Sequence, residues 1–137
     1  MKRIVVDLDG TLTVDEKGVP YPDKRPNLAF IDQLRAYREL GFEIIVATAR
    51  NMNTYQNSVG LITAKTLPVI FAWLEAHQIP YDEIHVGKPW CGHAGFYVDD
   101  KAIRPSEFCR LSYDEIMRLL AAERTSERQS PSEGGEQ

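Results

Sequence analysis

The sequence predicts an α/β fold, in which helices cover both faces of a central parallel sheet to form a three-layer sandwich. Two observations predict it. Short runs of β-forming residues alternate with patterns of helical spacing, and strands separated by helices form parallel sheets with right-handed crossovers. The chain has 137 residues, 43% of them apolar and 26% charged, which is typical of one compact core. We therefore expect one domain over residues 1–124.

The first expected strand is residues 3–6, an apolar run typical of a strand that is buried on both faces. From Asn27, apolar residues recur at helical spacing until Gly41 ends the helix. Between the strand and this helix lies a turn-rich segment, marked by Gly18, Pro20, Pro22 and Pro26. The sequence thus opens with a strand, an irregular segment and a helix.

Three more strands and two more helices are expected beyond Gly41. The strands are residues 43–47, 83–86 and 95–98, each a short apolar run. A second helix carries apolar residues on one face and is closed by Pro80. A capping box at residues 112–115 opens a last helix.

The last segment, residues 125–137, contains no large apolar residue. Such a segment cannot bury enough apolar surface to offset the entropy lost on ordering. We expect a disordered C-terminal tail.

Composition excludes several classes of partner. The net charge is −4 and no stretch concentrates Lys and Arg, so a nucleic acid is not an expected partner. No apolar run approaches the ~20 residues of a membrane helix, and the N-terminus has too few apolar residues for a signal peptide. The two cysteines, Cys91 and Cys109, do not form a disulfide framework. We expect a cytoplasmic protein.

Polar clusters follow each of the four expected strands. In parallel α/β sheets, ligands bind beyond the carboxyl ends of the strands, so we expect these clusters to meet at one edge of the sheet. They are residues 7–13, 48–51, 87–89 and 99–100.

The first cluster contains two carboxylates, Asp7 and Asp9, separated by one residue at a strand end. The strand pleat would direct both side chains to one side, and Gly10 would let the backbone turn away. With Asp99 and Asp100 added, mutual repulsion favours a hard divalent cation among the oxygens, and Mg²⁺ prefers such ligands. A magnesium site is the expected cofactor site.

This chemistry suits phosphoryl transfer to a carboxylate. Asp7 would attack phosphorus and Asp9 would act as general acid and base. Lys88 would supply positive charge to the nucleophile and the phosphoryl oxygens. Further hydrogen bonds to these oxygens would come from the Thr48 hydroxyl and from backbone N–H groups near Leu8 and Ala49. Arg50 would bind a second anionic group or a sugar hydroxyl of the substrate.

The four clusters resemble the four motifs of the haloacid dehalogenase superfamily of phosphohydrolases, in the same order. The first motif resembles residues 7–13, and the others match Thr48, Lys88 and the pair Asp99–Asp100. The resemblance implies a Rossmann-like sandwich. It also implies three direct magnesium ligands, which are Asp7, the backbone carbonyl of Asp9, and Asp99, with Asp100 as an indirect or water-mediated partner.

More narrowly, residues 47–52, 86–92 and 96–105 resemble small phosphatases associated with bacterial capsule polysaccharide synthesis. This resemblance implies a small phosphorylated carbohydrate or polyol as substrate. Residues 14–26 and 51–64 leave room only for a flap and a loop, so no sizeable cap domain is expected. The open site would take bulky substrates or be covered by a neighbouring subunit of a homo-oligomer.

Several alternatives compete with this interpretation. A calcium loop beginning at Asp7 would place Leu12 where glycine is required and Gly18 where a bidentate Glu should be, which excludes it. Lys65 is a weaker candidate than Lys88 for the cation of the site. Residues 90–93 offer only one Cys and one His as ligands, which does not favour a metal site there. For function, the alternatives are a phosphatase for nucleotides or nucleic-acid ends and, more distantly, a non-catalytic domain that binds a phosphorylated ligand.

Overall fold

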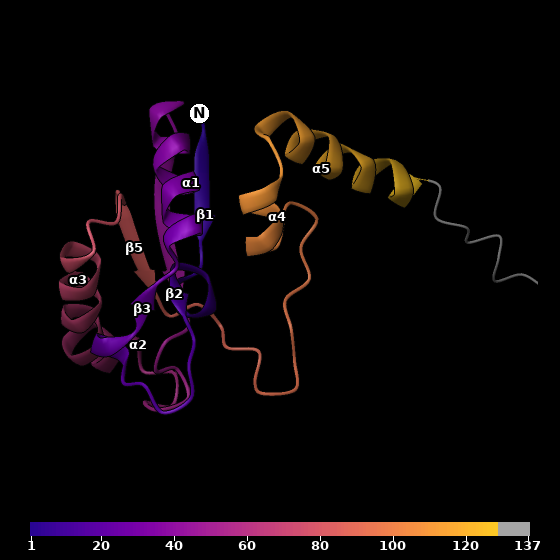
Figure 1. Cartoon of the computed structure of the whole chain (residues 1–137). Coiled ribbons are helices and arrows are strands. Elements are labelled where there is room, and N and C mark those ends of the chain that lie inside the picture. The colour runs from indigo at the N-terminus through magenta and orange to yellow at the C-terminus, as the bar shows by residue number, and fades with distance from the viewer. Residues whose placement is uncertain (129–137) are drawn as a thin grey trace, which may run out of the picture. The chain divides into compact units, whose positions relative to one another are not determined.

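The computed structural model describes residues 1–128 of the chain (Figure 1). They form two compact units, Met1–Ala94 and a second unit that begins at Gly95. The first unit contains the sheet and most of the buried residues.

The central sheet of the first unit has three parallel strands, in the order β1 (Arg3–Val6), β4 (Glu43–Thr48), β5 (Glu83–Val86). The middle strand β4 carries the buried aliphatic residues Ile44, Ile45 and Val46. Consecutive residues of a strand point to opposite faces of the sheet, so these three buried residues show that both faces of β4 are covered, as its continuous apolar run indicates. All three strands lie where the sequence predicts them, but the prediction that the first strand is buried on both faces was wrong, since Val5 is 65% exposed.

Helices complete the α/β arrangement. Helix α1 (Leu28–Glu39) begins at Asn27, whose side chain accepts a hydrogen bond from the Phe30 N–H. A second helical stretch consists of α2 (Val59–Leu61), the turn η3 (Ile62–Thr66) and α3 (Leu67–Ala76). Both stretches contribute fully buried side chains to the core, namely Ile31, Leu34, Ile62, Ile70 and Leu74. The predicted fold class, α/β with a central parallel sheet, is confirmed.

A small hairpin follows the first strand, where the sequence predicts a turn-rich segment with room for a short flap. Strands β2 (Thr13–Val14) and β3 (Arg25–Pro26) pair antiparallel, and the short 3-10 helix η2 (Tyr21–Asp23) lies between them. We call residues 13–26 the flap. No large cap is inserted here, as expected.

The expectation that no apolar run approaches the length of a membrane helix was wrong, because the stretch Val59–Ala76 is long and apolar enough to cross a membrane by length and composition alone. The core helix of a soluble protein passes the same test. In the structure the stretch is divided among three helical elements, and 28% of it is buried. Its inward-facing residues Ile62, Ile70 and Leu74 are fully buried, as in a helix that packs on a sheet.

The second unit contains α4 (Pro105–Arg110) and α5 (Tyr113–Arg128). The predicted capping box opens α5, because the Glu115 N–H donates to Ser112 Oγ and the Ser112 N–H donates to Glu115 Oε1. Helix α5 runs past Thr125, where the sequence predicts the tail to begin. The rest of that predicted tail, residues 129–137, lies outside the described residues.

The prediction of a fourth strand at residues 95–98 was wrong. These residues form no strand, and the side chains of Phe96 and Val98 are 79% and 86% exposed. The connection from the end of β5, residues 87–94, is shorter than the dozen or so residues that a parallel crossover needs. An apolar run predicted a strand, but its connection did not permit a further parallel strand.

Candidate active site

Three of the predicted site residues lie at the carboxyl ends of the three sheet strands. Asp7 directly follows β1, Thr48 is the last residue of β4, and Lys88 lies just beyond β5. The Lys88 N–H donates to the Thr48 carbonyl oxygen at 3.1 Å, and Lys88 Nζ lies 3.8 Å from Asp7 Oδ1. The sheet therefore brings the predicted nucleophile and the predicted cation together.

The chain turns sharply after β1, in the turn η1 (Leu8–Leu12). Asp9 keeps an extended conformation, but Gly10 has a φ of 80°, which glycine adopts without a steric penalty. The Gly10 N–H donates to Thr13 Oγ1 at 3.1 Å. This turn presents Asp7 and Asp9 next to each other at the edge of the sheet.

The Asp7 carboxylate is accessible, with 39% of its side chain exposed. Its Oδ1 atom accepts a hydrogen bond from the Leu8 N–H at 2.8 Å. Burial raises the pKa of Asp7, and the Lys88 charge together with the Leu8 N–H opposes the rise only in part. The Leu8 N–H predicted to bind phosphate is thus engaged with Asp7 in this arrangement.

The Asp9 carboxylate is held by two cations. Arg50 binds it as a fork, with Nε 3.0 Å from Oδ2 and Nη2 2.8 Å from Oδ1. Lys24 Nζ lies 3.0 Å from Oδ1. Burial by itself would raise the pKa of Asp9, but the hydrogen bonds and charges of Arg50 and Lys24 outweigh it and lower the pKa below its usual range.

Arg50 is buried, with 4% of the residue exposed. Its guanidinium carbon lies 4.1 Å from the centre of the Tyr21 ring, a cation–π contact. Its backbone N–H donates to Thr48 Oγ1 at 3.0 Å. Its Nη1 atom is buried without a hydrogen-bond partner among the described residues. Substrate binding by Arg50, Thr48 and Ala49 stays a prediction.

Sequence reasoning missed the contribution of the flap. Lys24 bridges Asp9 and Asp15, with Nζ 2.8 Å from Asp15 Oδ1. Its ammonium also lies 5.0 Å from the centre of the Tyr21 ring. The turn-rich composition predicted a loop but gave no indication that the loop folds back onto Asp9.

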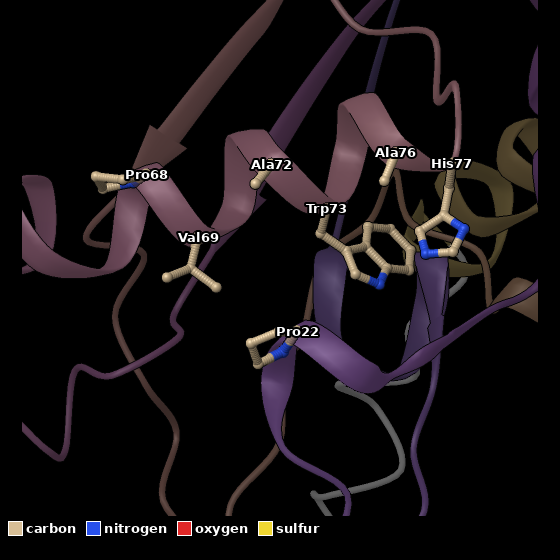
Figure 2. A pocket seen from close by; sticks show the side chains of 7 residues that line it. All are labelled: Pro22, Pro68, Val69, Ala72, Trp73, Ala76 and His77. Carbon is tan, nitrogen blue, oxygen red and sulfur yellow. The ribbon is translucent and has the colours of Figure 1, made fainter.

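The flap is anchored from the helical side by Trp73. The Trp73 indole N–H donates to the Lys24 carbonyl oxygen at 2.8 Å. Figure 2 shows this ring projecting from α3 toward the segment that carries Pro22, at an apolar hollow. None of the predicted site residues lines that hollow, which is formed by Pro22, Pro68, Val69, Ala72, Trp73, Ala76 and His77.

Comparison with known proteins identifies the family. Residues 4–72 match the family model of haloacid dehalogenase-like hydrolases. The chain is 56% identical to a structural-genomics target from Vibrio cholerae with a crystal structure. The two structures align with a TM-score of 0.86 over 90% of this chain and 99% of that one. This chain belongs to the haloacid dehalogenase-like hydrolases. None of the curated proteins matches it.

The family match covers only part of the predicted site. It includes the first two clusters, with Asp7, Asp9 and Arg50, whereas Lys88, Asp99 and Asp100 lie beyond residue 72. Membership in the haloacid dehalogenase-like hydrolases supports a phosphatase-type hydrolase in general. The narrower resemblance to capsule-synthesis phosphatases is not addressed by these matches.

Asp99 and Asp100 belong to the second unit. Asp99 Oδ1 accepts a hydrogen bond from the Lys101 N–H at 2.8 Å, and both residues are exposed. Within residues 1–128, no group of three or more His, Cys, Asp or Glu side chains is arranged to hold a metal ion. Metal binding by Asp99 and Asp100 therefore stays a prediction.

The donors of the first unit suit the magnesium ion that haloacid dehalogenase-like hydrolases generally use. Mg²⁺ takes one or two carboxylates and keeps several waters. Asp7 offers an accessible carboxylate. Both Asp9 carboxylate oxygens are bound by cations, so Asp9 would contribute through its backbone carbonyl, the role that the family resemblance implies.

Proposed function

We propose that this protein is a magnesium-dependent phosphomonoester hydrolase that works through an aspartyl-phosphate intermediate. One observation carries the proposal: the accessible Asp7 carboxylate stands at the carboxyl end of β1 with Lys88 Nζ 3.8 Å away. A cation beside a partly buried carboxylate favours its ionised, nucleophilic form.

In the first step an Asp7 oxygen forms a bond to phosphorus, and the bond from phosphorus to the ester oxygen breaks. The leaving alkoxide takes a proton from Asp9. Lys88, the Thr48 hydroxyl and the N–H groups near Leu8 and Ala49 stabilise the charge on the phosphoryl oxygens. The products of this step are a free alcohol and an aspartyl-phosphate.

In the second step a water molecule attacks the phosphorus atom and gives a proton to Asp9. The bond between phosphorus and Asp7 breaks, which releases inorganic phosphate and restores the carboxylate. Asp7, the Asp9 carbonyl and Asp99, with Asp100 nearby, would hold Mg²⁺, which supplies positive charge to neutralise the phosphoryl oxygens. Asp9 reaches this step as a carboxylate because it has given its proton to the alkoxide, and its contacts with Arg50 and Lys24 favour that carboxylate form.

For the substrate we propose a small phosphorylated carbohydrate or polyol, in cytoplasmic synthesis of capsule or another polysaccharide. The resemblance of residues 47–52, 86–92 and 96–105 to the capsule-synthesis phosphatases supports this proposal. A net charge of −4 argues against a long polyanion as substrate. Without a large cap the site is open, so a small substrate would need another cover. A neighbouring subunit of a homo-oligomer would cover that site.

The decisive experiment measures phosphate release from a generic aryl phosphate with and without Mg²⁺. Excess chelator should abolish the activity, and Asp7→Asn should lower kcat by at least about a thousandfold because the nucleophile is lost. Asp32→Asn, which changes an exposed carboxylate on α1, is the matched control and should keep full activity. Undiminished hydrolysis by Asp7→Asn would refute the mechanism.

A substrate panel separates this proposal from the alternatives. Sugar and polyol phosphates should have the highest kcat/KM. Higher values for mononucleotides or end-phosphorylated oligonucleotides would favour the alternative that rests on residues 48–50. A rise in melting temperature with a phosphorylated ligand but without turnover would favour a non-catalytic binding domain.

A further inference from the structure

We propose that Arg50 and Lys24 are positioning residues that act through Asp9, and that Arg50 is not part of the substrate-binding site. This inference rests on the proposed function, because it assigns Asp9 the proton transfers of phosphate-ester hydrolysis. It reassigns Arg50, for which the sequence predicts substrate binding.

Arg50 and Asp9 form a bidentate fork. Two nitrogens of Arg50 contact two different oxygens of Asp9, at 3.0 and 2.8 Å. A bidentate pair of this kind fixes the plane of the carboxylate as well as its position. Proton transfer requires the donor oxygen within about 2.6–3.2 Å of its partner, so the fork sets the geometry of the catalytic step.

Positive and negative charges balance around Asp9. Arg50 and Lys24 carry two positive charges, and Asp9 and Asp15 carry two negative charges, joined by contacts of 2.8 to 3.0 Å. The Arg50 side chain is only 1% exposed. Only Nη1 of this guanidinium lacks a hydrogen-bond partner among the described residues, and that atom is itself buried. A guanidinium that is paired and buried in this way offers no accessible site for a second anionic group of the substrate.

The contacts also distinguish the two oxygens of Asp9. Oδ1 accepts from both Arg50 Nη2 and Lys24 Nζ, whereas Oδ2 accepts from Arg50 Nε alone. Each carboxylate oxygen has about two lone-pair sites. Among the described contacts, Oδ2 therefore keeps a free site, and we assign to it the exchange of protons with the leaving group and with water.

The two positioning residues are themselves held in place. The Tyr21 ring lies beneath the Arg50 guanidinium and also contacts the Lys24 ammonium. The Lys24 backbone is held by the Trp73 indole. Tyr21 and Lys24 are both flap residues, so the flap completes the surroundings of Asp9.

The test compares kcat and KM of Arg50→Ala on an alkyl phosphate. If Arg50 positions Asp9, kcat should fall by about tenfold to a hundredfold while KM stays within about twofold, a part of the ~10²–10⁴ that general acid–base catalysis supplies. Arg50→Lys should recover little, because an ammonium cannot form the fork. A rise in KM with kcat unchanged, or full recovery by Arg50→Lys, would overturn the proposal.

A double-mutant cycle gives a second readout that a structural defect would not imitate. In an Asp9→Asn background, Arg50→Ala should cause almost no further loss of kcat, since its effect passes through Asp9. The losses caused by Arg50→Ala and by Asp9→Asn should also both shrink when the leaving group is a good one, such as an aryl oxide. Additive losses in the cycle would contradict the inference.

Two further variants keep the test independent of folding and of the proposed function. If Arg50→Ala does not fold, Lys24→Met should lower kcat with KM unchanged, since it removes one of the two cations. Arg25→Ala removes a flap arginine that pairs with Glu16 and should behave as wild type. If the wild-type enzyme hydrolyses the substrate and Lys24→Met keeps full kcat, only this inference is refuted. Hydrolysis by Asp7→Asn refutes the proposed function.

Discussion

Asp7 and Asp9 have pKa values that shift in opposite directions although they are neighbours at one turn. Burial raises the pKa of Asp7, whereas the contacts of Asp9 with Arg50 and Lys24 outweigh burial and lower its pKa. The protein alone thus stabilises the basic form of Asp9, which hydrolysis of the aspartyl-phosphate needs. Cations beside Asp7, including the Mg²⁺ of the proposed mechanism, would favour the ionised nucleophile.

At Gly87 we predict that alanine would destabilise the fold, both by straining the backbone and by a steric clash. Gly87 has a φ of 88°, and an added Cβ would lie 2.9 Å from Val59 Cγ2. Gly87→Ala should therefore lower the free energy of unfolding by about 1–3 kcal/mol and disturb Lys88, the next residue. Urea denaturation measures the change.

Two comparisons separate the causes of that loss. Gly18→Ala has a similar φ of 79° but nothing within 4 Å of the added Cβ, so it should show the backbone cost alone. Adding Val59→Ala to Gly87→Ala removes the atoms that clash and should restore part of the stability. Equal losses for Gly87→Ala and Gly18→Ala would contradict the predicted clash.

Asp82 should make stability depend on pH. The Ile44 N–H, donating to Oδ2 at 2.8 Å, together with the Arg38 charge lowers the pKa of Asp82. A lowered pKa in the folded state stabilises the protein above the unfolded pKa, and the contribution is lost as pH falls through the folded pKa. Asp82→Asn should destabilise at neutral pH and match wild type in strong acid. Thermal denaturation across pH tests this, and a difference that persists in acid would contradict it.

The sequence predicted correctly those helices and strands that are determined by local interactions. The strands β1, β4 and β5 and the helix α1 were correct because their apolar runs and stop signals are contained within each element. The strand expected at residues 95–98 was wrong because pairing depends on the connection, residues 87–94, and not on the run itself. The pairing of β2 with β3 in the flap was not predicted, because turn-forming residues indicate a turn but do not show which strands the turn connects.

Asn27, at the start of α1, connects this helix to the turn η1 beside the site. Asn27 caps the helix by accepting from the Phe30 N–H, and its Nδ2 donates to the Thr11 carbonyl oxygen at 3.1 Å. Asn27→Ala should lower the free energy of unfolding by about 1–2 kcal/mol, from a lost cap and a lost hydrogen bond. Thermal melting measures this. Asn53→Ala, in an exposed loop, should change it by less than about 0.5 kcal/mol.

In the whole molecule, the site depends on residues that are distant in sequence, and this limited what could be predicted. Asp7, Thr48 and Lys88 were placed together because parallel strands share a carboxyl edge. The Asp9 contacts span 15 residues to Lys24 and 41 to Arg50. No periodicity in the sequence indicates contacts at such separations, so the contacts of Asp9 with Arg50 and Lys24 could be recognised only from the structure.

The two units predict the behaviour of shortened chains. A chain that ends at Ala94 keeps the sheet and its core but lacks Asp99 and Asp100, so it should fold and show no magnesium-dependent phosphatase activity. A chain that ends at Arg124 should stay active, because the predicted domain ends there. Circular dichroism and phosphate release measure both properties. Activity in the shorter chain would exclude a required role for Asp99 and Asp100.

The hydrogen bond from Trp73 to the Lys24 carbonyl also makes Trp73 an intrinsic fluorescence probe of the flap. Indole emission depends on the polarity around the ring and on the hydrogen bond of its N–H. The chain contains two tryptophans, so Trp90→Phe leaves a single tryptophan that is 4% exposed and bonded to the flap. A wavelength shift on adding phosphate or magnesium would then report a change around the flap on ligand binding, without any added dye.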